Sequence, residues 1–314
     1  MNKSVFLLFS IIFLVLTSAA WADTQPPALR EIPSDYYAPA EQQGRLEELY
    51  YSTWESFTYE EHSRELTKRA IVYLPYGYSE NEQYNVFYLM HGGWSNETTT
   101  LGTPESPNRF KNVIDHAIQD RIMQPMIIVC PTYNNTNENG QDSDSFSLAM
   151  QLNRQLYHET FNDLLPAVEG KYSTFAENTT PEGLKASREH RGFGGFSMGS
   201  VATWRTFEHG GIDYFYYFMP MSCGTSMDDD VIQASAENAD PTSYFIWIMT
   251  GTGDFAFSYD NGRVNRMRNT EWFTEAGENI DGNFTYYVKD GYGHDGIAAN
   301  EYTFNGLCWF WNHE

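Results

Sequence analysis

The sequence is short of cysteine, of basic residues and of long apolar runs, and each shortage excludes a class of protein. Three cysteines in 314 residues are too few for a disulfide scaffold. Lys and Arg number 19 against 42 Asp and Glu, a net charge of −23, which argues against nucleic-acid partners and docking on anionic lipid. The chain contains neither H-E-x-x-H nor paired C-x-x-C, so we expect no metal site and no cofactor.

The N-terminal residues have the pattern of an export signal. Lys3 precedes an apolar run at 5–16, and Ala20-Trp21-Ala22 is a small-x-small cleavage site. The run is short for a membrane span, and no later stretch approaches the ~20 apolar residues of one. We therefore expect a signal peptide at 1–22, a leader at 23–46 and one domain at 47–314. The protein would be secreted, with no membrane contact after cleavage.

Strand-like and helix-like segments alternate along the domain. Short β-rich or apolar runs predict strands at 69–74, 86–90, 126–129, 193–196, 214–219, 244–249 and 284–288. Amphipathic spacing predicts helices at 109–120, 148–168, 267–276 and 302–311. The alternation predicts an α/β fold, with a mostly parallel central sheet and helices on both faces. The polar segment 134–145 is expected to be a loop and is a candidate for a partial lid.

A serine between glycines follows one of the strand-like runs. Gly195-Phe196-Ser197-Met198-Gly199 fits G-x-S-x-G, the pattern of a nucleophile elbow. The glycines allow a tight strand-to-helix turn that exposes the serine hydroxyl at the edge of the sheet. The Met198 amide would then point at the developing oxyanion.

A pair of glycines follows another predicted strand and supplies the second oxyanion donor. His91-Gly92-Gly93 comes directly after the run at 86–90, where hydrolases of this kind place a backbone N–H. We assign that role to the Gly93 amide. An ordinary glycine turn is the alternative, and His91 itself is expected to be structural.

The serine needs a base, and chain order selects one histidine. In the order Ser…Asp/Glu…His, the base follows the acid, and only His209, His294 and His313 follow Ser197. His209 falls on the helix that leaves the elbow, and His313 is next to the terminus. His294 lies in a glycine-rich loop after the last predicted strand, where the base is required.

The acid should follow the preceding strand. Asp254 ends the turn Thr250-Gly251-Thr252-Gly253-Asp254 after the aromatic run at 244–249, and would orient His294. Asp260 is the reserve candidate and Asp290 a weaker one. An aspartate in such a turn is often only a turn residue.

With these residues placed, the chain resembles carbohydrate esterase family 1, the secreted feruloyl and acetyl-xylan esterases of the α/β-hydrolase superfamily. The resemblance covers roughly residues 47–311. It rests on the segments 72–78, 88–93, 161–172, 195–199, 251–254 and 293–295. It implies an α/β-hydrolase fold and places the family's nucleophile, acid and base on Ser197, Asp254 and His294, which order and context had already selected.

The chain departs from the family pattern at a few positions. Ser200 stands where the family's elbow usually has a second glycine, which should alter packing more than chemistry. Trp94 after the oxyanion glycines, and Cys223-Gly224 after a strand, are less typical, and they are candidates for shaping the pocket.

The resemblance implies a secreted serine esterase acting on feruloylated or acetylated plant cell-wall xylan. Feruloyl (hydroxycinnamoyl) esters are favoured because a phenolic acid suits an aromatic pocket. The aromatic candidates for that pocket are Trp94, Tyr133, Phe255, Phe257 and Tyr292. Since aromatics are abundant throughout the chain, packing is their alternative role, and acetyl-xylan esterase is the alternative activity.

Other functions remain open on the same fold. Acyl transfer to a carbohydrate acceptor is one, as in the related mycolyltransferases. A formylglutathione hydrolase is disfavoured by the export signal. A non-catalytic carbohydrate-binding protein is disfavoured because nucleophile, acid and base all have candidates in the right order.

Export would permit a disulfide. Cys130, Cys223 and Cys308 leave one thiol over in any pairing. We favour Cys223 with Cys308, because both fall late in the chain near the proposed site, and three free thiols are the alternative.

Overall fold

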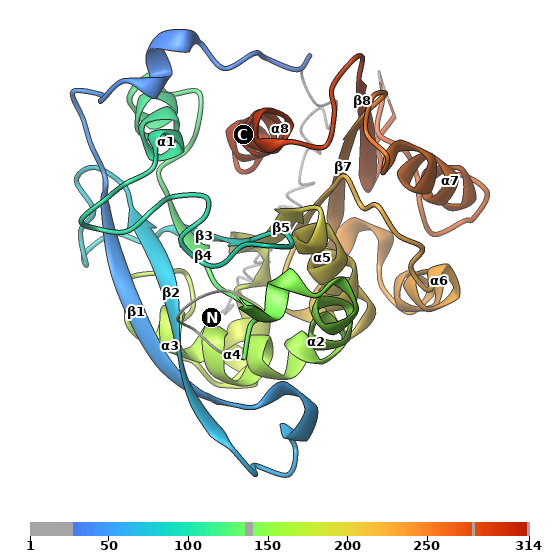
Figure 1. The fold of residues 1–314 in the computed structure, drawn as a ribbon, viewed down its shortest axis with the longest axis horizontal. Coiled ribbons are helices and arrows are strands. Elements are labelled where there is room, and N and C mark those ends of the chain that lie inside the picture. The colour runs from blue at the N-terminus through green and yellow to red at the C-terminus, as the bar shows by residue number, and fades with distance from the viewer. Residues whose placement is uncertain (1–27, 136–140, 278–279, 313–314) are drawn as a thin grey trace, which may run out of the picture.

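Within residues 28–135, 141–277 and 280–312, which the computed structural model describes, a sheet of eight strands forms the centre of the protein (Figure 1). In spatial order the strands are β1 (Arg45–Trp54), β2 (Glu65–Leu74), β4 (Met126–Cys130), β3 (Asn85–Met90), β5 (Arg191–Phe196), β6 (Tyr217–Met221), β7 (Phe245–Gly251) and β8 (Phe284–Lys289). β2 pairs antiparallel with both β1 and β4, and every pairing from β4 to β8 is parallel. The predicted α/β fold with a mostly parallel sheet is confirmed. The predicted signal peptide lies outside the described residues.

Helices cover both faces of the sheet. They are α1 (Arg109–Gln119), α2 (Phe146–Glu159), α3 (Leu165–Glu169), α4 (Pro181–Ala186), α5 (Met198–Glu208), α6 (Asp229–Glu237), α7 (Phe257–Met267) and α8 (Gly296–Trp309). On β3, Tyr88 joins the apolar cluster that includes α2 and α5, and its neighbour Phe87 joins the cluster that includes α1 and α8. Figure 1 shows α1 and α8 on one side of the sheet and α2, α3 and α4 on the other. Two-sided cover explains why the central strands are nearly continuous apolar runs.

Several elements differ from those predicted, and three of them bear on the site's surroundings. β1 was not expected, and the predicted helix at 267–276 is wrong, since the helix there is α7 and ends at Met267. The apolar residues after α7 pack from a loop and not from a helix. Phe273 is buried, and the Ala276 N–H donates to the Phe284 carbonyl at 2.8 Å. The last helix begins at Gly296, because the Asp295 carboxylate caps it.

The leader packs on the domain. The Tyr36 ring stacks on His116 of α1 at 4.8 Å and its hydroxyl donates to Asp120 at 2.5 Å. Arg30 exchanges two hydrogen bonds with the Asn305 side chain of α8. The expected division between residues 46 and 47 falls inside β1. Among the described residues, no helix is long and apolar enough to cross a membrane.

The predicted disulfide between Cys223 and Cys308 is wrong. All three cysteines are free. Cys223 is buried in the cluster under α5, whereas Cys308 packs from α8 against the cluster on the opposite face of the sheet. Both cysteines are close in sequence to the proposed site, but the sheet separates them in space.

The free thiols make thermal stability independent of reductant. Losing a structural disulfide typically costs about 2–5 kcal/mol, so we expect dithiothreitol to leave the Tm unchanged. Thiol titration of the denatured, unreduced protein with Ellman's reagent should find all three cysteines. A titration that finds a single thiol would contradict the structure.

Candidate active site

Ser197 occupies the sharp turn between β5 and α5. Its φ of 60° and ψ of −116° lie outside the usual regions, and its N–H donates to the Met221 carbonyl at 2.9 Å. A Cβ on Gly195 or on Gly199 would lie 2.4 Å from the carbonyl oxygen of Met90, so neither position can carry a side chain. The two glycines of the motif thus allow the turn to lie directly against the end of β3.

Two other residues that follow strands at this edge of the sheet also have a positive φ. Trp94, in the loop after β3, has a φ of 53°, and Ser222, directly after β6, has a φ of 51°. Non-glycine residues adopt a positive φ at a cost of about 1–3 kcal/mol each and do so mostly at functional sites. Three of the six described non-glycine residues with a positive φ therefore lie at the carboxyl edge of the sheet, around Ser197.

His294 lies in the loop between β8 and α8 and reaches both Ser197 and Asp254. Its Nε2 is 2.8 Å from Ser197 Oγ, and its Nδ1 is 2.8 and 2.9 Å from the two Asp254 oxygens. An Nδ1–H that donates to the carboxylate leaves Nε2 free to accept the serine proton. The structure thus brings together the three residues that chain order selected.

The loop that carries Asp254 packs against the histidine loop through backbone contacts. A Cβ on Gly251 would lie 2.2 Å from the Tyr292 carbonyl oxygen, and the Gly253 N–H donates to the same oxygen at 3.0 Å. The absence of a side chain at Gly251 lets the two loops approach closely enough for Asp254 to reach His294.

Asp254 is buried but ionised. Burial alone would raise the pKa of its carboxyl, but the hydrogen bonds from His294 and from the Ala256 N–H (2.7 Å) outweigh burial and hold the pKa below its usual value. A charged carboxylate beside Nδ1 fixes the tautomer of the imidazole and favours its protonated form.

The reserve acids make other contacts. Asp260 accepts the Cys223 N–H at 3.0 Å and pairs with Arg263 at 3.1 Å, and burial raises its pKa to about 7. Asp290 is exposed and accepts the Thr252 hydroxyl at 2.8 Å. Among the described residues, Asp254 is the carboxylate that hydrogen-bonds to His294.

The two predicted oxyanion donors lie beside the serine. A Cβ on Gly92 would be 3.5 Å from the Cβ of Ser197, so the glycine loop directly borders the nucleophile. Within the described part of the chain, the N–H groups of Met198 and Gly93 donate to no protein acceptor, whereas the next N–H, that of Trp94, donates to the Ser143 carbonyl at 2.9 Å. Both donors are therefore available to a ligand.

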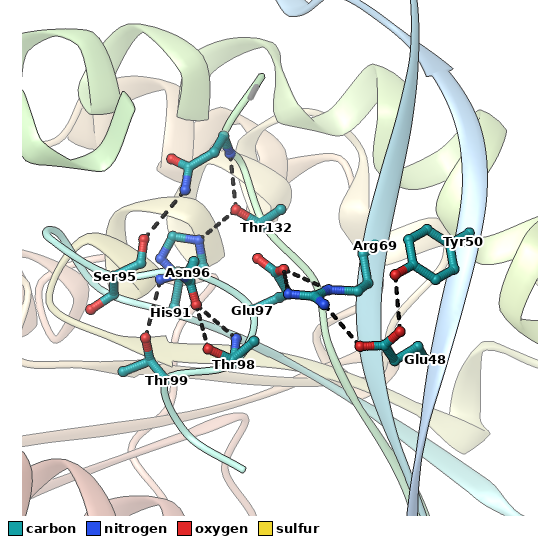
Figure 2. Close-up of polar contacts among 11 residues, drawn as sticks. Glu48, Tyr50, Arg69, His91, Ser95, Asn96, Glu97, Thr98, Thr99 and Thr132 are labelled. Atoms are coloured by element: carbon teal, nitrogen blue, oxygen red, sulfur yellow. Dashed lines mark hydrogen bonds and ion pairs between the residues drawn. The ribbon is translucent and has the colours of Figure 1, made fainter. Parts of the chain in front are cut away.

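His91 anchors the glycine loop from behind. Its Nε2 is 2.7 Å from the Thr132 hydroxyl oxygen (Figure 2). Its Nδ1 is 2.7 Å from the Gly92 carbonyl oxygen. Burial lowers the pKa of His91 to about 4, so the ring stays neutral at ordinary pH. These contacts give His91 a structural role.

An ion pair that sequence reasoning missed holds the same loop to the edge of the sheet. Arg69 of β2 donates to the buried Glu97 at 2.8 and 2.9 Å and to Glu48 of β1 at 2.8 Å (Figure 2). Glu97 lies four residues beyond Gly93. The three residues are far apart in sequence and form no motif, so no local pattern could have revealed them.

A cavity of about 650 Å³ opens beside Ser197 and His294 and is mostly apolar. Of the five predicted pocket aromatics, Trp94 and Phe255 line it. Lining residues that the sequence did not single out include Phe146, Val201, Met221 and Thr225. They come from segments far apart in the chain, which no sequence motif joins.

The other three predicted pocket aromatics do not line the cavity. Tyr133 is buried, its ring lies tilted against His91 with centroids 4.4 Å apart, and its hydroxyl donates to the Gly92 carbonyl at 2.9 Å. The hydroxyl of Tyr292 donates to Glu301 at 2.7 Å, and Phe257 is half-buried at the start of α7. The predicted lid segment 134–145 includes residues 136–140, which lie outside the described part of the chain. Its last part reaches the cavity loop through Ser143.

Comparison with known sequences finds esterases and xylanases. The model of a family described as putative esterase matches residues 64–295. Endo-1,4-beta-xylanase Y of Acetivibrio thermocellus is 36% identical over 291 residues, which cover 90% of this chain and 24% of the relative. The chain spans about a quarter of the length of the curated relatives it matches.

Comparison with solved structures finds feruloyl esterases. A serine-to-alanine mutant of the feruloyl esterase module from Clostridium thermocellum, complexed with sinapinate, is 33% identical with a TM-score of 0.75, covering 93% of this chain and 95% of that one. A CE1 ferulic acid esterase from the anaerobic fungus Anaeromyces mucronatus shares the fold, at 18% identity and a TM-score of 0.61, over 91% of this chain and 99% of that one.

The Arg69–Glu97 pair predicts an asymmetry between the two acids that contact Arg69. Glu97→Ala should lower kcat for 4-nitrophenyl acetate by about tenfold or more, because small displacements of an oxyanion donor are costly. Glu48→Ala removes the other acid of the same arginine and should stay within about twofold, because Glu48 is not on the loop. Thermal unfolding of both variants would check that they fold. Equal losses in the two variants would show that the pair does not position the loop.

Proposed function

The chain belongs to the putative esterase family and is a carboxylic ester hydrolase of the carbohydrate esterase family 1 type, and from this we propose that it is a secreted feruloyl esterase of plant cell-wall xylan. One observation carries the proposal: the hydrogen-bonded series Ser197–His294–Asp254 opens onto an apolar cavity beside two unused N–H donors.

The triad would work by acyl transfer through the serine. His294 Nε2 takes the proton of Ser197 Oγ as the oxygen attacks the ester carbonyl, and Asp254 stabilises the imidazolium. The Met198 and Gly93 N–H groups hold the tetrahedral oxyanion, and each such donor is worth roughly 3–4 kcal/mol in related sites.

The intermediate then collapses to products. The bond to the sugar oxygen breaks, and the sugar hydroxyl leaves with the proton from His294. Water, deprotonated by the same imidazole, attacks the acyl-enzyme and releases the free acid by the reverse steps.

The shape and lining of the cavity favour a phenolic acyl group. A cavity of about 650 Å³ with mostly apolar walls exceeds what an acetyl group fills and suits a planar hydroxycinnamoyl group. The Clostridium thermocellum relative was solved with sinapinate, an acid of that class.

The N-terminal pattern and the relatives support action outside the cell. Residues 1–22 have the composition of a cleavable signal peptide. The curated relatives are named as a xylanase and as a xylanase/feruloyl esterase. We therefore place the substrate ester on feruloylated xylan.

Product release tests the proposal directly. Wild-type protein should release ferulate from feruloylated arabinoxylan, and Ser197→Ala should release none while keeping its thermal stability. Chromatography of the acids released from feruloylated and from acetylated xylan would measure this. Acetate without ferulate would move the substrate to acetyl-xylan, and neither product would point to a transferase or a binding protein.

A second variant tests the acid. Asp254→Asn should lower kcat by about 10⁴-fold, as the equivalent change does in serine proteases, because an amide favours the wrong tautomer of His294. Asp260→Asn is the matched control, since Asp260 is equally buried but contacts Arg263 and the Cys223 N–H. An undiminished kcat in Asp254→Asn would remove Asp254 from the mechanism.

A further inference from the structure

Exposed aromatic side chains surround the mouth of the cavity. Trp94, Phe255 and Phe146 are 69%, 62% and 51% exposed, and all three line the cavity. The interior is formed by buried side chains such as Met198 and Met221. A group of exposed aromatic rings around one opening is typical of an interaction site.

Trp94 is held in place at a cost. A tryptophan with a φ of 53° is strained, and a glycine at this position would avoid the strain. The loop is nevertheless fixed: Trp94 N–H and Ser95 N–H donate to the carbonyl and hydroxyl oxygens of Ser143 at 2.9 Å each. The backbone therefore presents the indole to solvent at a defined position.

Phe255 is fixed next to the proposed base. Its ring lies 4.3 Å from the His294 ring, and it packs so closely on Gly224 that a Cβ there would be 2.1 Å away. His294 returns its proton to the departing sugar oxygen, so the sugar must leave past this ring. The rim is thus adjacent to the alcohol side of the ester.

The cavity is large enough for the acyl group of a polymeric substrate but too small for its polysaccharide. About 650 Å³ accommodates a hydroxycinnamoyl group but not a polysaccharide chain as well. The sugars next to the ester must therefore lie over the mouth. Among the described residues that line the cavity, Asp295 is the one carboxylate and none is Lys or Arg, so no Lys or Arg side chain there recognises the sugars.

We propose that Trp94, Phe146 and Phe255 form a stacking platform for the sugar residues next to the ester oxygen. The apolar C–H faces of pentose rings pack against aromatic faces, as neutral sugars lack other apolar surface. This inference rests on the proposed function, because it assumes an ester of a polysaccharide in the cavity.

The test compares one acyl group on two alcohols. For Trp94→Ala, the ratio of kcat/KM for a feruloylated arabinoxylo-oligosaccharide to that for methyl ferulate should fall about tenfold, mainly through KM. Trp94→Phe should restore part of the ratio, and 0.5 M NaCl should leave it unchanged. Tyr76→Ala removes an aromatic ring that is 58% exposed and does not line the cavity, and should keep the wild-type ratio.

Binding separates this inference from the proposed function. In the Ser197→Ala background, calorimetric titration with unesterified arabinoxylo-oligosaccharide should detect binding that Trp94→Ala weakens. An unchanged ratio together with unchanged binding would overturn the platform. A wild-type protein that cleaves neither ferulate ester would overturn the proposed function, and the titration would still decide whether Trp94 binds sugar.

Discussion

The carbonyl oxygen of Met90 sets how closely the nucleophile strand can lie to its neighbour. Both motif glycines, Gly195 and Gly199, lie so close to this oxygen that a Cβ on either would clash with it. Met90 ends β3, and the next residues form the glycine loop with the Gly93 N–H. The same close approach therefore builds the serine turn and places the second donor beside it. A methyl group at either glycine would force β5 and α5 away from β3 and separate nucleophile from donor.

The hairpin at the edge of the sheet supports this arrangement from two sides. Successive residues of β2 point to opposite faces. Lys68 pairs at 2.6 Å with the buried Glu159 of α2, while Arg69 holds Glu97 in the glycine loop. Lys68 and Arg69 thus form internal pairs, and none of the described residues that line the cavity is Lys or Arg. An acidic protein whose cavity lining contains no Lys or Arg suits a neutral polymer.

Sequence alone predicted those parts of the site whose signal is local. The nucleophile, acid and base candidates each follow a predicted strand, and a parallel sheet brings such positions to one edge. Contacts between segments far apart in the chain could not be predicted from the sequence. The Arg69–Glu97 pair, the packing role of Tyr133 and the separation of Cys223 from Cys308 all depend on which face of the sheet a residue occupies. The start of α8 was missed because a helix buried on most sides has no amphipathic period.

The strained residues in the segments that follow β3, β5 and β6 have a consequence for directed evolution. Trp94, Ser197 and Ser222 each hold a conformation that glycine adopts freely. A screen for heat resistance alone would reward glycine at these positions, and would select against the indole and the nucleophile. A library meant to yield a more thermostable enzyme should therefore keep the residues at this edge of the sheet unchanged. It should vary the opposite end, where loops can be shortened or stiffened without altering the active site.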